Sequence, residues 1–570
     1  MDSLIHQFSQ LTIATNFELV GQSDFRPHPP FQRFIAVENH KKTVLKAMSK
    51  YFYIHEVETV LQDKLRSDIQ SIESIEKDFF DGDIPYHPLI RDDNYKRALA
   101  NITERFRPPR KCRPTHIFDV QHHYPHKRSS NAEAPFSTQP FFKDQLPKDT
   151  KPTFGNMEDI IFKWTRHIIH NIKHDIDTFD DHLYYILLHN KSAIINADDP
   201  NKVRSISGFP RPQNIGFIQL FWSYMAWLKR HPGNTPLLWG YETILGGWLR
   251  LNYELSRSYI RTTIVTLDKS RFDKFYMFEI QDDIDNMFLN EFLDFDNGYV
   301  PTTAYDQTHL TWTPEKAARM RRLFLWLCYS FRNTPTVIHD GRMYRRKWFG
   351  MPSGVYTTQL YDTIHFGITN MTVLYDMGFS DQQILLYKGE GDDILFQLAV
   401  FIPPNMHQEF LTTYAQIDNQ RFGSITRPEK CEVHNTPQGV QVLGYRNNRG
   451  LPKRDDIDLL AQLYHTKSLN PTPSKTMAMA VGISYASCGL SKRLYATCKD
   501  IFEYYESQGY TPDERTFSYT FYSDILTKPM INFKRFPKRI ELLDHLLNFS
   551  YDSPETMERF FPRSHFLDDF

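Results

Sequence analysis

Hydrophobic and polar residues recur along this chain with two periods. Apolar spacings of three and four residues are typical of amphipathic helices, whereas alternation or short β-branched runs are typical of strands. Helices are predicted over residues 44–67, 157–173, 215–229, 314–331, 355–374 and 405–420, and through most of the last third. Strands are predicted over 201–211, 261–267, 384–388, 394–400 and 440–445, with a hairpin over 336–348. Together these elements indicate an α+β fold with an antiparallel sheet.

Residues 124–154 show neither period. They are rich in Pro, Ser and charged residues. This composition predicts a long irregular segment, either a surface loop or an arm that lies over another part of the molecule.

The composition narrows the class of protein. A chain of 570 residues with 41% hydrophobic and 15% aromatic content is long enough for several subdomains and a large core, which excludes a disordered or fibrous protein. The five cysteines are scattered without a C-x-x-C pair, so we expect a reducing compartment and no zinc site. The first ten residues do not resemble a secretory signal, and the longest apolar runs fall short of the roughly 20 residues of a membrane span.

Positive charge is local rather than general. The formal net charge is −1, so affinity for nucleic acid would have to come from clusters of Lys and Arg. One cluster lies within residues 105–113 and a longer one within 319–347. A solvated charged surface is the simpler interpretation of either cluster taken alone.

The tripeptide Gly391-Asp392-Asp393 lies between two predicted strands and so at the tip of a hairpin. Two adjacent carboxylates repel each other unless a cation lies beside them. Asp268 follows the strand 261–267, and Asp273 comes five residues later. Asp268, Asp392 and Asp393 could therefore converge on two Mg²⁺ or Mn²⁺ ions, since oxygen ligands favour these metals. The tripeptide also occurs by chance, and Asp268 alone could equally cap a helix.

Two further segments carry groups suited to a nucleotide. The turn at Ser353-Gly354 leads into a helix with Thr358 and Asp362 one turn apart, and free amides and a hydroxyl there could contact phosphate or ribose. An ordinary loop-to-helix junction explains the same residues. Lys202, Arg204 and Arg211 on the predicted strand 201–211 would suit a triphosphate.

The order and spacing of these motifs resemble those of viral RNA-dependent RNA polymerases. The series is K-x-R, D-x4-D, S-G-x3-T, G-D-D, a Lys and then L-G-Y, and it covers residues 202–445. The segment GMPSGVYTTQLYD is most similar to the polymerases of partitiviruses and related double-stranded RNA viruses, picobirnaviruses among them.

The resemblance implies a role for each matching residue. Asp268 and Asp392 would be the main metal ligands, with Asp393 supporting the second ion. Lys202, Arg204 and Arg211 would neutralise the triphosphate, and Lys430 would protonate the pyrophosphate. The ribose 2′-hydroxyl would be read by Asp273, Ser353 and Thr358, with Gly354 and Asp362 beside them. Many positive-strand virus polymerases have Asn where this chain has Asp362, and an ionised Asp cannot donate a hydrogen bond.

The resemblance also implies a right-hand polymerase. Its expected parts are an N-terminal segment bridging fingers and thumb (1–60), fingers (61–256 and 297–347), palm (257–296 and 348–460) and thumb (461–570). Expected partners are single-stranded and double-stranded RNA, nucleoside triphosphates and a viral capsid protein, with no membrane. The expected location is the virion interior and the host cytoplasm.

Two alternative functions remain. A reverse transcriptase shares the palm, but it usually carries an aromatic residue before x-D-D, where this chain has Glu390-Gly391. A non-catalytic, capsid-associated RNA-binding protein would leave the order of the motifs unexplained. His167, His170 and His174 lie at helical spacing without an acidic partner, so packing is expected rather than metal binding.

Overall fold

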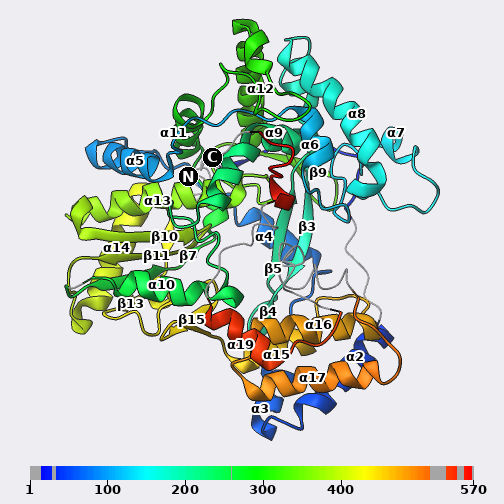
Figure 1. Ribbon diagram of the computed structural model, residues 1–570, viewed down its shortest axis with the longest axis vertical. Coiled ribbons are helices and arrows are strands. Elements are labelled where there is room, and N and C mark those ends of the chain that lie inside the picture. Colours follow the sequence, from blue (N-terminus) through cyan, green and yellow to red (C-terminus); the bar gives the residue numbers. More distant parts are fainter. Residues whose placement is uncertain (1–14, 28–33, 259, 514–533, 549–557, 568–570) are drawn as a thin grey trace, which may run out of the picture.

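The computed structural model describes residues 15–27, 34–258, 260–513, 534–548 and 558–567, and it combines antiparallel sheets with many helices (Figure 1). The mixed helix-and-sheet class predicted from the sequence is confirmed. Among the described residues, no helix has the length and apolar character to cross a membrane.

A four-stranded sheet holds the hairpin that carries Gly391. Its strand order is β10-β11-β6-β13, with every neighbouring pair antiparallel. The strands are β6 (Thr263–Leu267), β10 (Ile384–Glu390), β11 (Asp393–Leu398) and β13 (Glu432–His434). The predicted strands at 261–267, 384–388 and 394–400 are therefore confirmed.

Helices cover both faces of this sheet. Side chains alternate between the faces along each strand, so Val265 and Phe396 join one hydrophobic cluster while Ile264 and Leu395 join another. The first face packs on α13 (Thr358–Asp376) and α14 (His407–Phe422), and the second on α10 (Gly247–Ser256). With both faces buried, the positions of the strand ends are fixed.

A second sheet has five strands in the order β1-β9-β8-β3-β5. The predicted hairpin over 336–348 forms its β8–β9 pair, and β5 supplies the predicted strand beginning at Val203. The strands are β1 (Phe17–Gln22), β3 (Ile186–Ser192), β5 (Val203–Gly208), β8 (Thr336–Val337) and β9 (Arg342–Arg346), and α4 (Ile72–Phe80) packs on β5.

Three 20-residue helices pack together at the top of Figure 1. They are α8 (Phe154–Lys173), α9 (Arg211–Arg230) and α12 (Pro314–Asn333), and they confirm the predicted helices at 157–173, 215–229 and 314–331. Residues 212–228 of α9 are all buried, as expected for a helix that other elements surround.

The irregular segment 124–154 agrees only in part with its prediction. It contains one short helix, α7 (Pro140–Lys143), and is otherwise irregular. A surface loop is wrong for its centre, because residues 132–138 are buried. Ala132, Ala134 and Phe136 pack into the core, where backbone hydrogen bonds to Pro152 and Arg211 satisfy the polar groups.

The C-terminal helices form a separate hydrophobic cluster with the N-terminal ones. The members are α2 (Phe34–Met48), α3 (Ile54–Glu58), α15 (Asp456–Tyr464), α16 (Pro473–Ala486), α17 (Lys492–Glu506) and α19 (Arg539–Leu547), at the bottom of Figure 1. The helical prediction for the last third is thereby confirmed for the described residues.

Two predicted elements are wrong in detail. The helix predicted over 44–67 is broken at 49–53 between α2 and α3, and residues 64–66 form β2, which pairs with β4 (Ile194–Asn196). The strand predicted over 440–445 is a tight hairpin, because Leu443 and Gly444 have φ angles of 54° and 75° and reverse the chain. That hairpin joins β14 (Gln441–Val442) to β15 (Tyr445–Asn448), followed by β16 (Leu451–Lys453).

The remaining elements connect these units. They include α5 (Asp93–Phe106), α6 (Ile117–His123), α11 (Phe278–Met287), β7 (Lys269–Ser270) and β12 (Ile425–Thr426).

Candidate active site

The three carboxylates predicted as metal ligands meet at one edge of the four-stranded sheet. Asp268 directly follows β6, and the β10–β11 turn presents Asp392 and Asp393. Leu267 pairs with Ile394, so the end of β6 lies beside the start of β11. All three residues line a cavity of about 260 Å³ together with Lys430.

These carboxylates lie close together and repel one another. Limited hydration, and then the charges of Asp392 and Asp268, raise the pKa of Asp393 to about 6. A hydrogen bond of 2.6 Å from the Leu443 amide lowers this pKa and so partly offsets the rise. Limited hydration also raises the pKa of Asp392, with Asp268 adding to the effect and Arg204 opposing it. Carboxylates held together in this way suit a divalent cation, and their oxygen atoms fit Mg²⁺ or Mn²⁺.

Arg427 contacts Asp268 and was missed in the sequence. Its Nε donates to Asp268 Oδ1 at 2.9 Å, a second guanidinium nitrogen contacts the same oxygen, and its amide donates to the Asp268 carbonyl at 3.1 Å. Asp268 Oδ2 has no hydrogen-bond partner among the described residues and remains available to a ligand. The neighbouring Lys269 forms a buried ion pair of 2.8 Å with Asp418 on α14, which fixes the chain at this point.

The Ser353-Gly354 turn is held against β5. Ser353 Oγ accepts a hydrogen bond of 3.0 Å from the Ser207 amide. A Cβ at Gly354 would lie 1.9 Å from the Ser207 carbonyl oxygen, so only glycine permits this approach. Asn214, which the sequence did not single out, bonds both to the Gly354 carbonyl and to the Tyr356 amide.

Helix α13 starts at this turn and carries the other two predicted residues. The Thr358 hydroxyl donates to the Val355 carbonyl at 2.7 Å, which leaves its oxygen able to accept. Asp362 Oδ1 is buried without a hydrogen-bond partner among the described residues. Thr363 Oγ1 accepts from the Gly391 amide at 2.8 Å, so α13 also positions the hairpin tip.

Asp273 and Asp362 lie close enough to Asp392 for their charges to interact. Limited hydration is the main cause that raises the pKa of each above its usual range, and Asp392 raises both further. Asp273 also borders a cavity of about 60 Å³ lined by Lys274 and Arg346.

The predicted basic residues separate into two groups. Lys202 precedes β5 and Arg204 lies on it, both exposed. Limited hydration, and then the charges of Arg204, Arg427 and Lys430, lower the pKa of Lys202, whereas Asp268 raises it. These cations therefore lie near one another and near Asp268.

Arg211 lies apart from this group. It is the first residue of α9, and its guanidinium donates to the carbonyls of Ala132 and Asn131 at 3.2 and 2.5 Å. These acceptors belong to the segment 124–154, which the sequence predicted to be either a surface loop or an arm lying over another part of the molecule. The structure therefore uses Arg211 to hold that segment.

Most of the basic cluster within 319–347 is already paired. Acids or backbone carbonyls bind most of its arginines, which leaves little of this charge for nucleic acid. The pairs are Arg321–Asp296, Arg322–Asp175, Arg332–Asp282, Arg342–Asp340 and Arg345–Glu18, and Arg346 donates to the carbonyls of Gly350 and Phe331. For all of these arginines but Arg342 and Arg346, the partner is distant in the sequence. The sequence alone therefore could not show that these side chains are already paired.

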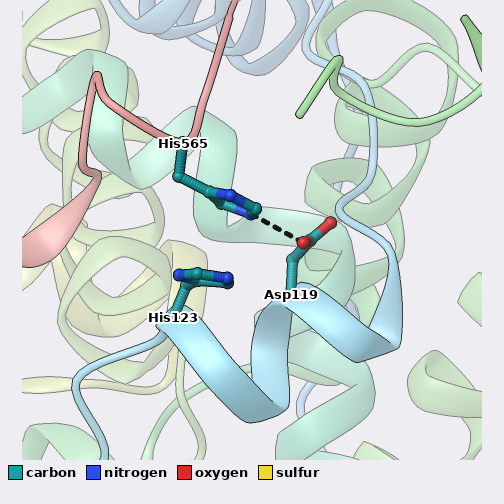
Figure 2. A group of neighbouring side chains, drawn as sticks. All are labelled: Asp119, His123 and His565. Atoms are coloured by element: carbon teal, nitrogen blue, oxygen red, sulfur yellow. Dashed lines mark hydrogen bonds and ion pairs between the residues drawn. The ribbon is translucent and has the colours of Figure 1, made fainter. Parts of the chain in front are cut away.

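A second group with metal-ligand side chains lies outside the sheet edge (Figure 2). His565 Nε2 lies 2.7 Å from Asp119 Oδ1, and its Nδ1 lies 2.7 Å from Thr303 Oγ1. The rings of His123 and His565 stack with centroids 3.5 Å apart and planes inclined by 16°. Two parallel rings cannot both direct a lone pair at one ion, so this arrangement holds the C-terminal residues against α6 rather than forming a metal centre.

Comparison with known proteins identifies the class. No family model matches the chain. It is 37% identical, over 615 aligned positions, to the RNA-directed RNA polymerase of White clover cryptic virus 1 (isolate Boccardo/2004), covering 100% of this chain and 99% of that protein. It is 29% identical to the RNA-directed RNA polymerase of Atkinsonella hypoxylon virus (isolate 2H), covering 55% of this chain and 49% of that one.

Carboxylates that converge on one cavity, with several cations nearby, are the groups that an enzyme of phosphate transfer needs. The comparisons give the family. The chain belongs to the viral RNA-directed RNA polymerases, alongside the enzyme of White clover cryptic virus 1. The membership predicted from the motif series is confirmed. Neither a reverse transcriptase nor a non-catalytic RNA-binding protein is favoured by these relatives.

Proposed function

We propose that this chain copies a viral double-stranded RNA genome by two-metal nucleotidyl transfer at the β6–β11 edge. Asp268 and Asp392 would hold two Mg²⁺ or Mn²⁺ ions, with Asp393 supporting the second. Bound ions of this kind activate a hydroxyl nucleophile and stabilise the leaving group. The observation that carries the proposal is the convergence of Asp268, Asp392 and Asp393 on one cavity.

The neighbouring cations supply the charge that a triphosphate requires. Lys202, Arg204, Arg427 and Lys430 would neutralise it while the 3′-hydroxyl of the growing strand attacks the α-phosphate and pyrophosphate leaves. Lys430 lines the same cavity as the carboxylates and is the candidate proton donor to pyrophosphate. Arg427 replaces Arg211 in this account, because Arg211 is committed to backbone carbonyls.

Sugar recognition would fall to Asp273, Ser353, Thr358 and Asp362, with Gly354 shaping the turn. A neutral Asp362 carboxyl can donate a hydrogen bond, as the Asn of other polymerases does. Burial, and then the charges of Asp392 and Asp273, raise the pKa of Asp362, which favours that neutral form.

The right-hand layout is part of the proposal. The palm would comprise 257–296 and 348–460, around the four-stranded sheet. The fingers would comprise 61–256 and 297–347, and the thumb 461–570. Residues 1–60 would bridge fingers and thumb, and the packing of α2 on α15 and α17 supports that role.

The proposed partners follow from the activity. They are single-stranded and double-stranded RNA, nucleoside triphosphates and a capsid protein, with action inside the virion and in the host cytoplasm.

The test is RNA synthesis by the purified chain on single-stranded RNA with four ribonucleoside triphosphates and Mg²⁺ or Mn²⁺. Asp392→Ala should reduce labelled product at least about 1000-fold, since a principal metal ligand is lost. Asp198→Ala, an exposed acid near β4, is the matched control and should be unchanged. Full synthesis by Asp392→Ala contradicts the proposal, and synthesis from deoxyribonucleotides alone would instead favour a reverse transcriptase.

A further inference from the structure

One turn of helix α13 contacts the tip of the β10–β11 hairpin. The Thr363 hydroxyl accepts a hydrogen bond of 2.8 Å from the Gly391 amide. The Gln359 side chain donates to Glu390 Oε1 at 3.1 Å. Gln359 and Thr363 are four residues apart, so they lie on one face of the helix, and this face meets the end of β10.

The contact around Thr363 is buried and close. Thr363 is fully buried, and its hydroxyl donates to the Gln359 carbonyl at 2.7 Å while its oxygen accepts from Gly391. The Tyr387 hydroxyl on β10 donates to the Thr363 carbonyl at 3.1 Å. A Cβ at Gly389 would lie 3.4 Å from the Thr363 methyl group, so strand and helix are in direct contact here.

This contact fixes the turn that carries a proposed metal ligand. Strands β10 and β11 are joined by two residues, Gly391 and Asp392. Gly391 has a φ of 68°, a conformation that favours glycine. Thr363 therefore holds the residue directly before Asp392.

The same helical turn carries two of the groups proposed to recognise the ribose. Thr358 and Asp362 each directly precede one of the two contact residues. Successive residues of an α-helix are rotated by about 100°, so the ribose-reading side chains and the hairpin contacts project from adjacent faces of one turn. Asp362 also lies near enough to Asp392 for their charges to interact. The backbone of this turn therefore sets the distance between the proposed ribose site and the hairpin.

We propose that Thr363 is a positioning residue for ribose selection, because its hydroxyl fixes the hairpin of Asp392 relative to the ribose-reading turn of α13. This inference rests on the proposed function. A nucleotide bound through its 2′-hydroxyl would then hold its α-phosphate beside Asp392 in a reactive position. A deoxyribonucleotide lacks that anchor, so it gains less from the fixed distance.

The decisive variant is Thr363→Val in the full chain, which keeps the shape of the side chain and removes the acceptor. Incorporation of one nucleotide on a short primed RNA template with Mn²⁺ is measured for a ribonucleotide and for the 2′-deoxyribonucleotide of the same base. We expect kcat/KM to fall at least about 10-fold for the ribonucleotide and less than about 3-fold for the deoxyribonucleotide, because a small misplacement costs most where the substrate is anchored.

Three further variants isolate the acceptor. Thr363→Ser keeps the hydroxyl and should retain the unmodified preference for ribonucleotides. Thr372→Val makes the same substitution later in α13, at a fully buried threonine whose hydroxyl donates to the Ile368 carbonyl of its own helix at 2.7 Å, and it should also retain that preference. Thr363→Ala removes the same acceptor with a residue that favours helices, and it replaces Thr363→Val if that variant does not fold.

The ratio of the two kcat/KM values separates positioning from stability. A loss of folded protein lowers both values by the same factor and leaves their ratio unchanged. Thr363→Val should melt at a lower temperature, since a buried amide loses its acceptor, yet only a fall in the ratio supports the proposal. An unchanged ratio, with or without a loss of activity, would show that Thr363 serves the fold alone and would overturn the proposal.

Hydrogen exchange tests the contact without metal or nucleotide. The Gly391 amide should exchange at least about 10-fold faster in Thr363→Val, and at the unmodified rate in Thr363→Ser and Thr372→Val. Equal exchange in all of these chains would overturn the proposal, because the hydroxyl would then not hold the turn.

Failure of this inference is distinguishable from failure of the catalytic proposal. Absence of incorporation by the unmodified chain would contradict the proposed function. Incorporation by the unmodified chain, together with an unchanged ratio in Thr363→Val, would contradict only the role of Thr363.

Discussion

At the scale of single residues, the buried carboxyl group of Asp285 on α11 makes the stability of the fold depend on pH. Burial raises its pKa to about 7, partly offset by hydrogen bonds from Gln281 and Cys328. Between its usual pKa and about 7 the folded chain holds a proton that the unfolded chain has lost, so stability falls as pH rises through this window. Asp285→Asn should have the same melting temperature as the unmodified chain at pH 5, and a melting temperature about 1–3 °C higher at pH 8. A constant difference across this range would contradict the assignment.

Arg427 gives a second prediction at this scale. Its guanidinium already occupies Asp268 Oδ1, so it competes with any cation that approaches that carboxylate. Arg427→Gln should therefore bind Mn²⁺ several-fold more tightly, by roughly 3- to 10-fold, in calorimetry without nucleotide. Its incorporation of nucleotides should fall, because one cation opposite the triphosphate is lost. Arg449→Gln, an exposed arginine beyond the β14–β15 hairpin, is the control, and equal Mn²⁺ affinity in both variants would count against competition.

The candidate site could be predicted only as far as single segments allow. Asp268, Asp392 and Asp393 were found because a strand end and a hairpin tip are visible in the sequence. Arg427 and Asn214 were missed because their partners lie 159 and 140 residues away. Arg211 was assigned to the triphosphate because the predicted strand 201–211 also carries Lys202 and Arg204, although its acceptors come from the segment 124–154.

At the scale of elements, Gly354 joins the turn before α13 to strand β5. A methyl group there would lie 1.9 Å from the Ser207 carbonyl oxygen, so Gly354→Ala must push the turn away from the strand. We expect a loss of about 1–3 kcal/mol in stability and a larger loss of nucleotide incorporation, since α13 also positions the hairpin tip.

Gly482 offers a matched control within a helix. A Cβ at Gly482 on α16 meets no atom within 4 Å, so Gly482→Ala should leave activity unchanged and stabilise the chain by up to about 1 kcal/mol. Thermal melting and incorporation assays compare the two variants. Equal effects from both would show that the contact with β5 is unimportant.

Elements were predictable where the sequence pattern is long. The helices α8, α9, α12 and α13 were located because their apolar periodicity extends over 19 or 20 residues. The strand β2 was taken for the end of a helix because three residues show no period, and its pairing with β4 is a tertiary contact. The reversal at Leu443 was missed because a positive φ at a leucine has no sequence signal.

At the scale of the whole molecule, the two ends of the described chain join distant parts. Strand β1 pairs with β9 across more than 300 residues, and α2 packs on the C-terminal helices. Residues 558–567 return to the opposite group of helices, where Phe561 and Phe566 pack around Trp222. None of these contacts has a local signature, which is why the sequence placed the elements but not their arrangement.

The last prediction concerns the return of the C-terminal residues. Asp119 has a fully buried side chain, and His565 is its partner at 2.7 Å, with Thr302 donating to the other oxygen at 3.3 Å. His565→Ala leaves that carboxylate without its main partner, which destabilises the contact by about 3 kcal/mol. Hydrogen exchange at the Leu567 and Thr303 amides, which bond to Pro301 and His565, should then become about 100-fold faster. Arg563→Ala, at an exposed position in the same segment, should leave that exchange unchanged, and equal protection in both variants would mean that the aromatic contacts alone hold the C-terminal residues in place.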